Sequence, residues 1–259
     1  MVKFFRWFCL FVLISTLTGC FYWIRAYQTY RQMEEFDQYF VITAADEFSL
    51  SFKDPILYSD DLISLAKLQP SVTSPLGLGE KWRYWFRKVD ELGRVIKPEI
   101  KFYFDLNFNQ QQRLTRWSFS PLFLQIAPAE FLEVSLRSLG TAKINTEKRQ
   151  LRANTDLIEK IATKLPQKNQ VIKQLGKPLE IKNEDHQDIY HYHFRLETHN
   201  IEQGYEDRTL SVIKLTFDKQ TDELIKMAGR FAGLKISINY RKYLANTDKQ
   251  LAQVLEKKI

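Results

Sequence analysis

Residues 99–108 of the chain read EIKFYFDLNF, and this stretch decides the expected fold. Its apolar side chains occupy every second position; the series is Ile100, Phe102, Phe104, Leu106 and Phe108. An alternation with a period of two residues is typical of a β-strand that buries one face and exposes the other. The stretch therefore predicts a strand in a sheet that covers a core on one side.

Further strands are predicted on both sides of this one. The upstream strand, residues 82–89, places Trp82, Tyr84 and Phe86 on one face and Arg83, Trp85 and Arg87 on the other. Downstream, a turn at residues 109–112 leads to a third strand. A short helix is expected at residues 59–67, because Asp60 and Asp61 suit a helix N-terminus, where the helix dipole favours negative charge.

The second half of the chain has a similar order of expected elements. Helices are expected at residues 155–164 and 168–175, and strands at 189–196, at 209–217 and from residue 224 onward. A further helix, expected at residues 128–139, belongs to the junction between the two halves. Tyr84-Trp85-Phe86-Arg87 in the first half aligns with Tyr192-His193-Phe194-Arg195 in the second. Similar short motifs that occur in the same order in both halves predict a repeat. Chance similarity between two amphipathic hairpins is the alternative.

The second half also resembles a known family. It contains Val171-x-x-x-Leu175-Gly176-x-Pro178, then an aromatic strand with Tyr190 and Tyr192, then Leu215-x-Phe217-Asp218 before a turn. This series is similar to the small outer-membrane lipoproteins of the SmpA/OmlA type, which includes BamE. The resemblance covers roughly residues 155–232. The chain departs from the family in its greater length and in its first half, which lacks the Leu-Gly-x-Pro element.

The resemblance implies a helical pair packed on a short antiparallel sheet, a shape that the β-lactamase inhibitor protein contains in tandem. The expected fold class is therefore α+β, with two related helix–antiparallel-sheet units in tandem, preceded by an N-terminal membrane-anchoring helix. The expected boundaries are a signal peptide at 1–19, a membrane-proximal helix at 20–40, the first unit at 41–150, the second unit at 151–245 and a C-terminal helix at 246–259. The resemblance also implies a role in outer-membrane assembly or integrity.

The N-terminus has the layout of a bacterial secretory signal. Residues 1–20 read MVKFFRWFCLFVLISTLTGC, with Lys3 and Arg6 ahead of an apolar run. The closing Leu-Thr-Gly-Cys resembles the lipobox of bacterial lipoproteins, which implies cleavage before Cys20 and acylation of its side chain. Each buried methylene contributes about 0.8 kcal/mol, so two or three acyl chains anchor a protein stably. Because Phe21 and not Asp follows, the resemblance implies the outer membrane, with the body facing the periplasm.

An uncleaved signal anchor is the alternative interpretation of the N-terminus. Residues 4–24 are apolar enough to span a bilayer, for which about 20 residues suffice, and this would place the protein in the inner membrane. Residues 25–40 contain no Gly or Pro and repeat apolar side chains every three residues, which predicts a helix. These side chains, which either pack against the body or contact lipid, are Tyr27, Tyr30, Met33 and Phe36.

The composition restricts the classes of function. The formal net charge of +7 suits a surface near anionic lipid, and the chain has no Lys/Arg run or nucleic-acid-binding signature, so nucleic acid is not an expected partner. Both cysteines, Cys9 and Cys20, lie in the first twenty residues, so the body has no thiol for a disulfide, a zinc site or a nucleophile. Hydrolase, phosphate-loop, dinucleotide and zinc-protease motifs are missing, so neither an enzyme nor a cofactor is expected.

Two sets of residues remain as candidate sites. His191 and His193 share one face of a predicted strand and are weak candidates for metal ligands. Arg83, Trp85 and Arg87 share an outward strand face and belong to residue types that are enriched at binding hot spots. We therefore expect a non-enzymatic lipoprotein whose partners are membrane lipid, through Cys20, and envelope proteins. The alternatives are an inner-membrane-anchored inhibitor or sensor, and a metal-binding protein that uses residues 186–199.

Overall fold

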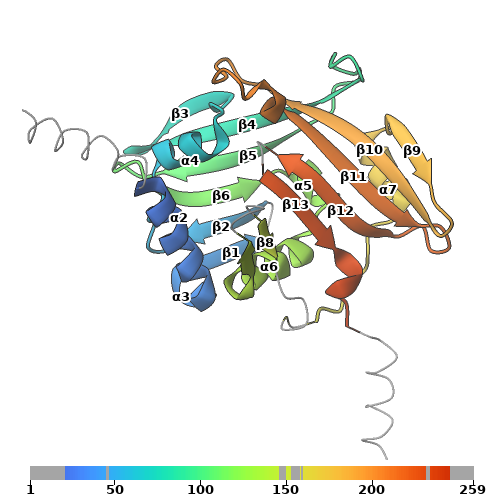
Figure 1. The fold of residues 1–259 in the computed structure, drawn as a ribbon, viewed down its shortest axis with the longest axis horizontal. Helices are drawn as coiled ribbons and strands as arrows, with labels where there is room; N and C mark the ends of the chain where they lie inside the picture. Colours follow the sequence, from blue (N-terminus) through green and yellow to red (C-terminus); the bar gives the residue numbers. More distant parts are fainter. Residues whose placement is uncertain are drawn as a thin grey trace, which may run out of the picture.

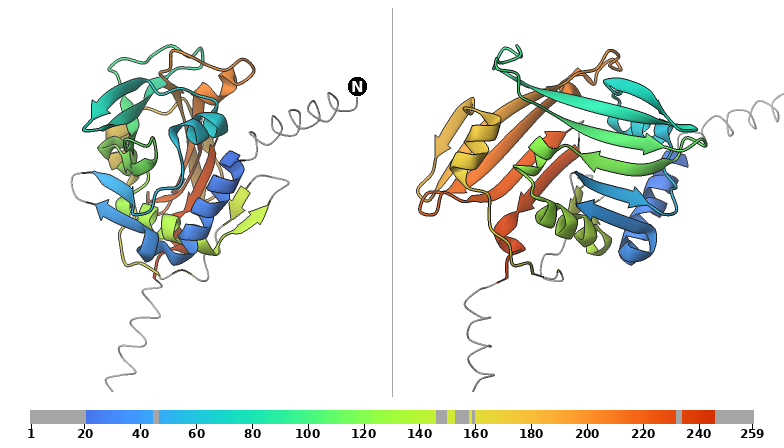
Figure 2. Two further views of the ribbon diagram at one scale, coloured as in Figure 1. Left: turned by 90° about the vertical axis from the view of Figure 1, so that its left-hand side faces the viewer. Right: turned by 180° about the vertical axis from the view of Figure 1, so that it is seen from behind.

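The computed structural model describes residues 21–44, 47–145, 150–152, 158, 160–231 and 234–245. The predicted signal peptide, the acylated Cys20 and the C-terminal helix at 246–259 lie outside these residues. Within the described residues the chain forms one large antiparallel sheet that curls on itself and carries few helices (Figure 1 and Figure 2).

The curled sheet contains eleven strands in the described part of the chain. In sequence order they are β1 (Phe40–Ala44), β2 (Phe48–Phe52), β3 (Val72–Leu76), β4 (Gly79–Val89), β5 (Lys101–Phe108), β6 (Leu114–Phe119), β9 (Glu180–Asn183), β10 (Gln187–Leu196), β11 (Leu210–Asp218), β12 (Leu224–Phe231) and β13 (Leu234–Asn239). Their spatial order is β1-β2-β6-β5-β4-β10-β11-β12-β13, with β3 added to β4 and β9 added to β10. A separate two-stranded ribbon pairs β7 (Lys143–Asn145) with β8 (Gln150–Arg152).

The two halves of the chain meet where β4 pairs with β10. Phe86 lies opposite Leu196, and Val89 lies opposite His193. The prediction of two helix–sheet units in tandem is therefore wrong, because the strands of both halves belong to one curled sheet. The physical reason is that an unpaired strand edge exposes a row of main-chain donors and acceptors. The β4–β10 pairing satisfies residues 86–89 and 193–196, while β3 and β9 pair with other parts of the same two edges.

Short helices lie along the curl and at its ends (Figure 1). They are α2 (Phe21–Gln32), α3 (Phe36–Tyr39), α4 (Ser59–Ala66), α5 (Pro121–Leu124), α6 (Ala129–Arg137) and α7 (Lys168–Leu175), with 3-10 turns η1 (Met33–Glu35), η2 (Ser138–Thr141), η4 (Glu206–Thr209) and η5 (Tyr240–Lys242). Phe123 of α5, Phe131 of α6 and Val171 of α7 are buried in the core. These helices therefore fill the inside of the curl.

The core consists largely of phenylalanine rings from both halves of the sheet. Phe86 of β4 stacks on Phe102 of β5, and Phe102 meets Phe194 of β10, each at 4.9 Å between ring centroids. Phe231 of β12 lies 6.3 Å from Phe86, although three strand pairings separate β12 from β4. Neighbouring strands are about 4.8 Å apart, so this contact requires the sheet to curl around its aromatic face.

Most of the predicted elements are present, with small shifts at their ends. The predicted strands correspond to β4, β5, β6, β10, β11 and β12, and three of the predicted helices correspond to α4, α6 and α7. The helix predicted at 155–164 is wrong in its described part, because residues 160–164 are not helical. There Ile161 forms a β-bridge with Leu244, and this long-range pairing replaces the local helix.

The described part of the predicted membrane-proximal helix is α2, which continues through η1 into α3. Arg25 forms two hydrogen bonds to the carboxylate of Asp61 on α4, one of them 2.7 Å long. The Tyr30 hydroxyl donates to the Ala142 carbonyl at 2.8 Å, and Phe36 is buried. One side of this helical segment is therefore fixed to the body.

Candidate functional site

The three residues predicted as an interaction surface lie together on the outward face of β4. The register of β4 and β5 places Tyr103 opposite Trp85 and Lys101 opposite Arg87. We call the five side chains Arg83, Trp85, Arg87, Lys101 and Tyr103 the outer patch. All five are at least partly exposed, while the alternating side chains of β4 face the core. The strand alternation thus separates this exposed surface from the packing surface.

The aromatic and cationic groups of the outer patch stack on one another. The Arg83 guanidinium lies 3.9 Å from the Tyr103 ring centroid and 5.1 Å from that of Trp85. Lys101 Nζ lies 4.7 Å from the Trp85 ring, and the two rings meet edge to face at 4.9 Å. Each such cation–ring contact contributes about 0.5–1 kcal/mol at an exposed site. Together these contacts restrict the side chains before any partner binds.

Ion pairs fix the two arginines of the outer patch further. Arg83 binds both carboxylate oxygens of Asp105, at 2.7 and 2.6 Å, and this hydrogen bonding raises the pKa of Arg83. Arg87 binds both oxygens of Glu197, at 2.9 and 2.7 Å, and lies 3.3 Å from Glu99. Two-point contacts of this kind set the orientation of a planar guanidinium. The outer patch is therefore a rigid surface whose positive charge is largely offset.

Main-chain contacts hold this surface at the joint between the two halves. The Trp85 N–H donates to Ser71 Oγ at 2.8 Å, and the Ser71 hydroxyl donates to the Glu197 carbonyl. The Glu197 N–H donates in turn to the Trp85 carbonyl at 2.8 Å. Ser71 is a contributor that the sequence pattern does not indicate, because it reaches Trp85 only through the pairing of β3 with β4.

The histidine candidates do not assemble a metal site. His191 and His193 lie on one face of β10, and His191 is 8% exposed. His191 Nδ1 lies 3.3 Å from a carboxylate oxygen of Glu180 on β9, while burial is the main cause that lowers the pKa of His191. Among the residues that the structure describes, no group of three His, Cys, Asp or Glu side chains could hold a metal ion. His191 is explained by the pairing of β10 with β9, and His193 by the pairing of β10 with Val89 of β4 and Val212 of β11.

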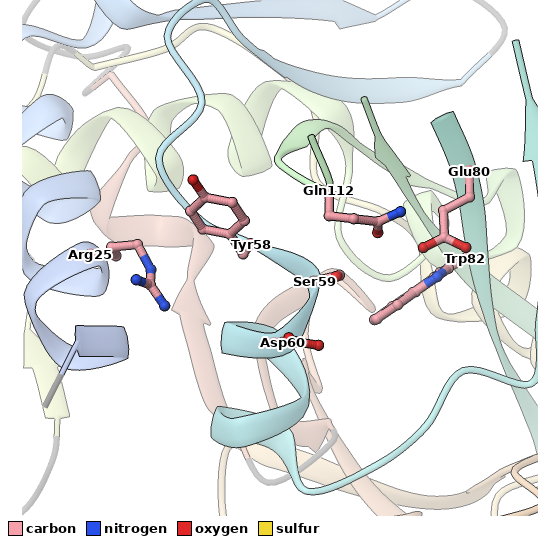
Figure 3. A pocket seen from close by; sticks show the side chains of 7 residues that line it. All are labelled: Arg25, Tyr58, Ser59, Asp60, Glu80, Trp82 and Gln112. Carbon is pink, nitrogen blue, oxygen red and sulfur yellow. The ribbon is translucent and has the colours of Figure 1, made fainter. Parts of the chain in front are cut away.

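A hollow of about 500 Å³ opens near the start of α2 (Figure 3). Its lining comes from α2, from the start of α4, from β4 and from the turn before β6, and consists of Arg25, Tyr58, Ser59, Asp60, Glu80, Trp82 and Gln112. Trp82 is buried, and its Nε1 has no hydrogen-bond partner within the described structure. The lining holds no histidine or thiol. It offers a ligand polar contacts from hydroxyl, carboxylate, guanidinium and amide groups.

Lys88 is a buried cation that the sequence pattern does not reveal. It lies on the inward face of β4, and its Nζ donates to the carbonyls of Leu175 and Lys177, both at 2.6 Å. The Nζ also lies 5.1 Å from the Tyr192 ring, and burial lowers the pKa of Lys88. These carbonyls belong to the end of α7 and the residues after it, so Lys88 positions this helix on the sheet.

Comparisons with known proteins leave the function to be argued from the chain itself. No family model, no curated protein and no solved structure matches it. In the part of the chain that the structure describes, no helix is both long enough and apolar enough to cross a membrane.

Proposed function

We propose that this protein is a lipid-tethered envelope protein that binds a second envelope protein through the outer patch and catalyses no reaction. The tether is Cys20, acylated and held in the outer membrane, and the body faces the periplasm. The observation that carries the proposal is the outer patch: Trp, Tyr and Arg side chains, fixed in one arrangement, on a sheet face that the core does not use.

The ordered side chains and the offset charges of the outer patch support a role in binding. A protein interface gains most from aromatic and Arg side chains that are already ordered, because less side-chain entropy is lost on docking. Asp105, Glu99 and Glu197 offset the charges of Arg83 and Arg87. The partner is therefore recognised by stacking and hydrogen bonding more than by net charge, and its affinity should depend weakly on salt.

A role in outer-membrane assembly has less support than the binding role. The resemblance that implied it also implied a helical pair on a short sheet, and the chain forms one large curled sheet instead. The assembly role stays a proposal that the identity of the bound protein tests.

Photo-crosslinking in intact envelopes tests the binding role. A photoreactive residue replaces Lys101, the most exposed cation of the outer patch, in the full-length chain. The matched control carries it at Lys214, which is exposed on β11 outside the patch. We expect a discrete protein adduct from position 101 that disappears when Trp85→Ala is added. The proposal is wrong if both positions give the same adducts, or if the adduct survives Trp85→Ala.

A further inference from the structure

The first two turns of α2 expose large apolar side chains. Phe21, Trp23, Ile24 and Tyr27 are each at least half exposed, whereas Thr29 and Gln32 are buried against the body. The usual arrangement of a surface helix, with apolar side chains inward, is thus reversed in this segment. Clustered apolar exposure of this kind marks a surface that contacts another apolar phase or protein.

A second exposed apolar feature lies at the turn between β3 and β4. Leu76 and Leu78 flank Gly77, and Leu78 is 82% exposed. Gly77 has a φ of +58°, a left-handed conformation that glycine adopts without steric cost. Seven of the twelve large apolar side chains that are exposed in the described residues lie on α2 or on β3 with this turn. The exposure is therefore concentrated in two segments.

Both segments lie at the same end of the molecule. In Figure 1 the start of α2 and the turn between β3 and β4 are both on the left, and the first view of Figure 2, which looks onto this end, shows α2 on one side of it and β3 on the other. Phe21 directly follows Cys20, the predicted site of acylation. The end of the molecule at which the chain would leave the membrane thus carries exposed apolar groups on both of its sides.

We infer that this end of the molecule rests on the lipid surface, with α2 in the head-group region on one side and Leu78 inserted on the other. The inference depends on the tether of the proposed function. An α-helix rises 1.5 Å per residue, so Tyr27 lies within about 10 Å of Phe21 along the axis. Interfacial helices bury their apolar face about 5–10 Å into the boundary between head groups and acyl chains. A tether at Cys20 therefore keeps the whole exposed segment within reach of lipid.

The charges at this end indicate which force holds it on the membrane. The hollow beside α2 is lined by Asp60 and Glu80 as well as by Arg25, whose charge is paired with Asp61, so the lining of this hollow offers anionic lipid little attraction. Insertion of apolar side chains then contributes most of the free energy of membrane contact, and salt does not screen this contribution. The contact should persist when the ionic strength is raised.

Lipid quenching in proteoliposomes tests the inference with the full-length chain. Vesicles of phosphatidylethanolamine and phosphatidylglycerol contain brominated acyl chains, and Leu78→dansylalanine supplies an environment-sensitive probe. The matched control is Leu92→dansylalanine, which is 75% exposed in the turn after β4. The eleven residues of β4 separate the two turns by about 35 Å. We expect quenching at position 78 to be severalfold stronger than at position 92, at low and high salt alike.

Co-flotation of the protein with the vesicles tests the lipid tether independently of the quenching measurement. Protein that floats but is quenched equally at the two positions overturns the inference and leaves the tether intact. Protein that does not float overturns the tether and the inference together. A further variant, Ile24→Asp, lies at an exposed position and should lower quenching at position 78 without changing the unfolding midpoint. Unchanged quenching in this variant would count against a role for α2.

Discussion

Lys88 illustrates how one buried side chain can fix the position of a helix. Its ammonium group donates to the carbonyls of Leu175 and Lys177 at the end of α7. The last carbonyls of a helix have no partner within the helix and carry partial negative charge. A cation at this place satisfies them and is favoured by the helix dipole. Lys88 thus replaces the polar cap that a solvent-exposed helix end would obtain from water.

The first prediction concerns Lys88→Met, which keeps the length of the side chain but removes the donor. Leaving the two carbonyls unpaired should cost about 1–3 kcal/mol in the free energy of unfolding, measured with urea. Burial lowers the pKa of Lys88 below 10.5 in the folded state. Between the lowered pKa and 10.5 the unfolded chain binds more protons, so the contribution of Lys88 to stability rises with pH in this window. A stability difference between wild type and variant that does not widen as the pH approaches 10.5 would contradict the lowered pKa of Lys88, and a variant as stable as wild type would contradict its role as the donor to α7.

Asp218 supplies a second prediction at the turn between β11 and β12. A hydrogen bond from Arg241 and backbone N–H groups of Thr221 and Gln220 lower the pKa of Asp218 from 3.8 to about 2. Because the folded pKa is the lower one, the stabilisation is present above pH 3.8 and is lost as the pH falls through about 2. Asp218→Asn should cost at most about 1 kcal/mol at neutral pH, since Arg241 is partly exposed. Unfolding curves should show the difference disappearing toward acidic pH; a constant difference would rule out the carboxylate as its source.

At the scale of elements, the alternation of apolar and polar residues predicted the strands that have one buried and one exposed face. It did not predict the strands that lack this pattern. β4, β5 and β10 carry long alternating series, so they could be predicted. β9 is four residues long and exposed throughout, and β3 contains Pro75, which usually argues against a strand. Such strands exist because a neighbour offers main-chain hydrogen bonds. Their own sequence carries little signal.

The ion pair between Arg25 and Asp61 is one of the contacts that attach α2 to the body, and it gives the third prediction. Asp61 is 1% exposed, and without Arg25 its carboxylate keeps the Tyr58 N–H, at 2.9 Å, as its donor. Arg25→Ala should therefore lower the free energy of unfolding by about 1–3 kcal/mol and speed hydrogen exchange of the α2 amides. The matched control is Arg31→Ala, since Arg31 pairs with Glu34 at the surface and should cost less than about 0.5 kcal/mol. Equal effects of the two substitutions would show that α2 is held by something else.

At the scale of the whole molecule, the similarity of the two halves predicted two separate units, whereas the strands of both halves assemble into one sheet. The pairing of Arg87 with Arg195 across β4 and β10 could not be foreseen, because it sets two like charges side by side. The structure tolerates it because Arg87 turns to Glu197 while Arg195 donates to the Gly93 carbonyl at 3.1 Å.

The sequence also predicted only part of the candidate site. Three members of the outer patch follow from the alternation of one strand. Lys101 and Tyr103 join them only through the register of β4 with β5. The hollow of Figure 3 draws on four separate segments, so no local pattern could indicate it.

The shared core makes the molecule one cooperative unit, which is the fourth prediction. All five Trp residues lie in the first half of the chain, so Trp fluorescence follows that half, while far-UV circular dichroism follows the whole sheet. The two midpoints should coincide. Phe231→Ala removes a ring of the second half that contacts Phe86 and Phe123 of the first half; it should cost about 3–5 kcal/mol and shift both signals together. A shift of the circular dichroism alone would mean that the halves unfold independently.

The most direct test of the central claim, tethering through Cys20, is the intact mass of the native protein together with membrane fractionation, compared with Cys20→Ala. We predict a mature species that begins at Cys20, carries acyl chains and fractionates with the outer membrane, and a Cys20→Ala variant that is neither acylated nor found there. A full-length species of 259 residues in the inner membrane, unchanged by Cys20→Ala, would contradict the account. The lipid tether, and the outer-membrane location with it, would then be wrong.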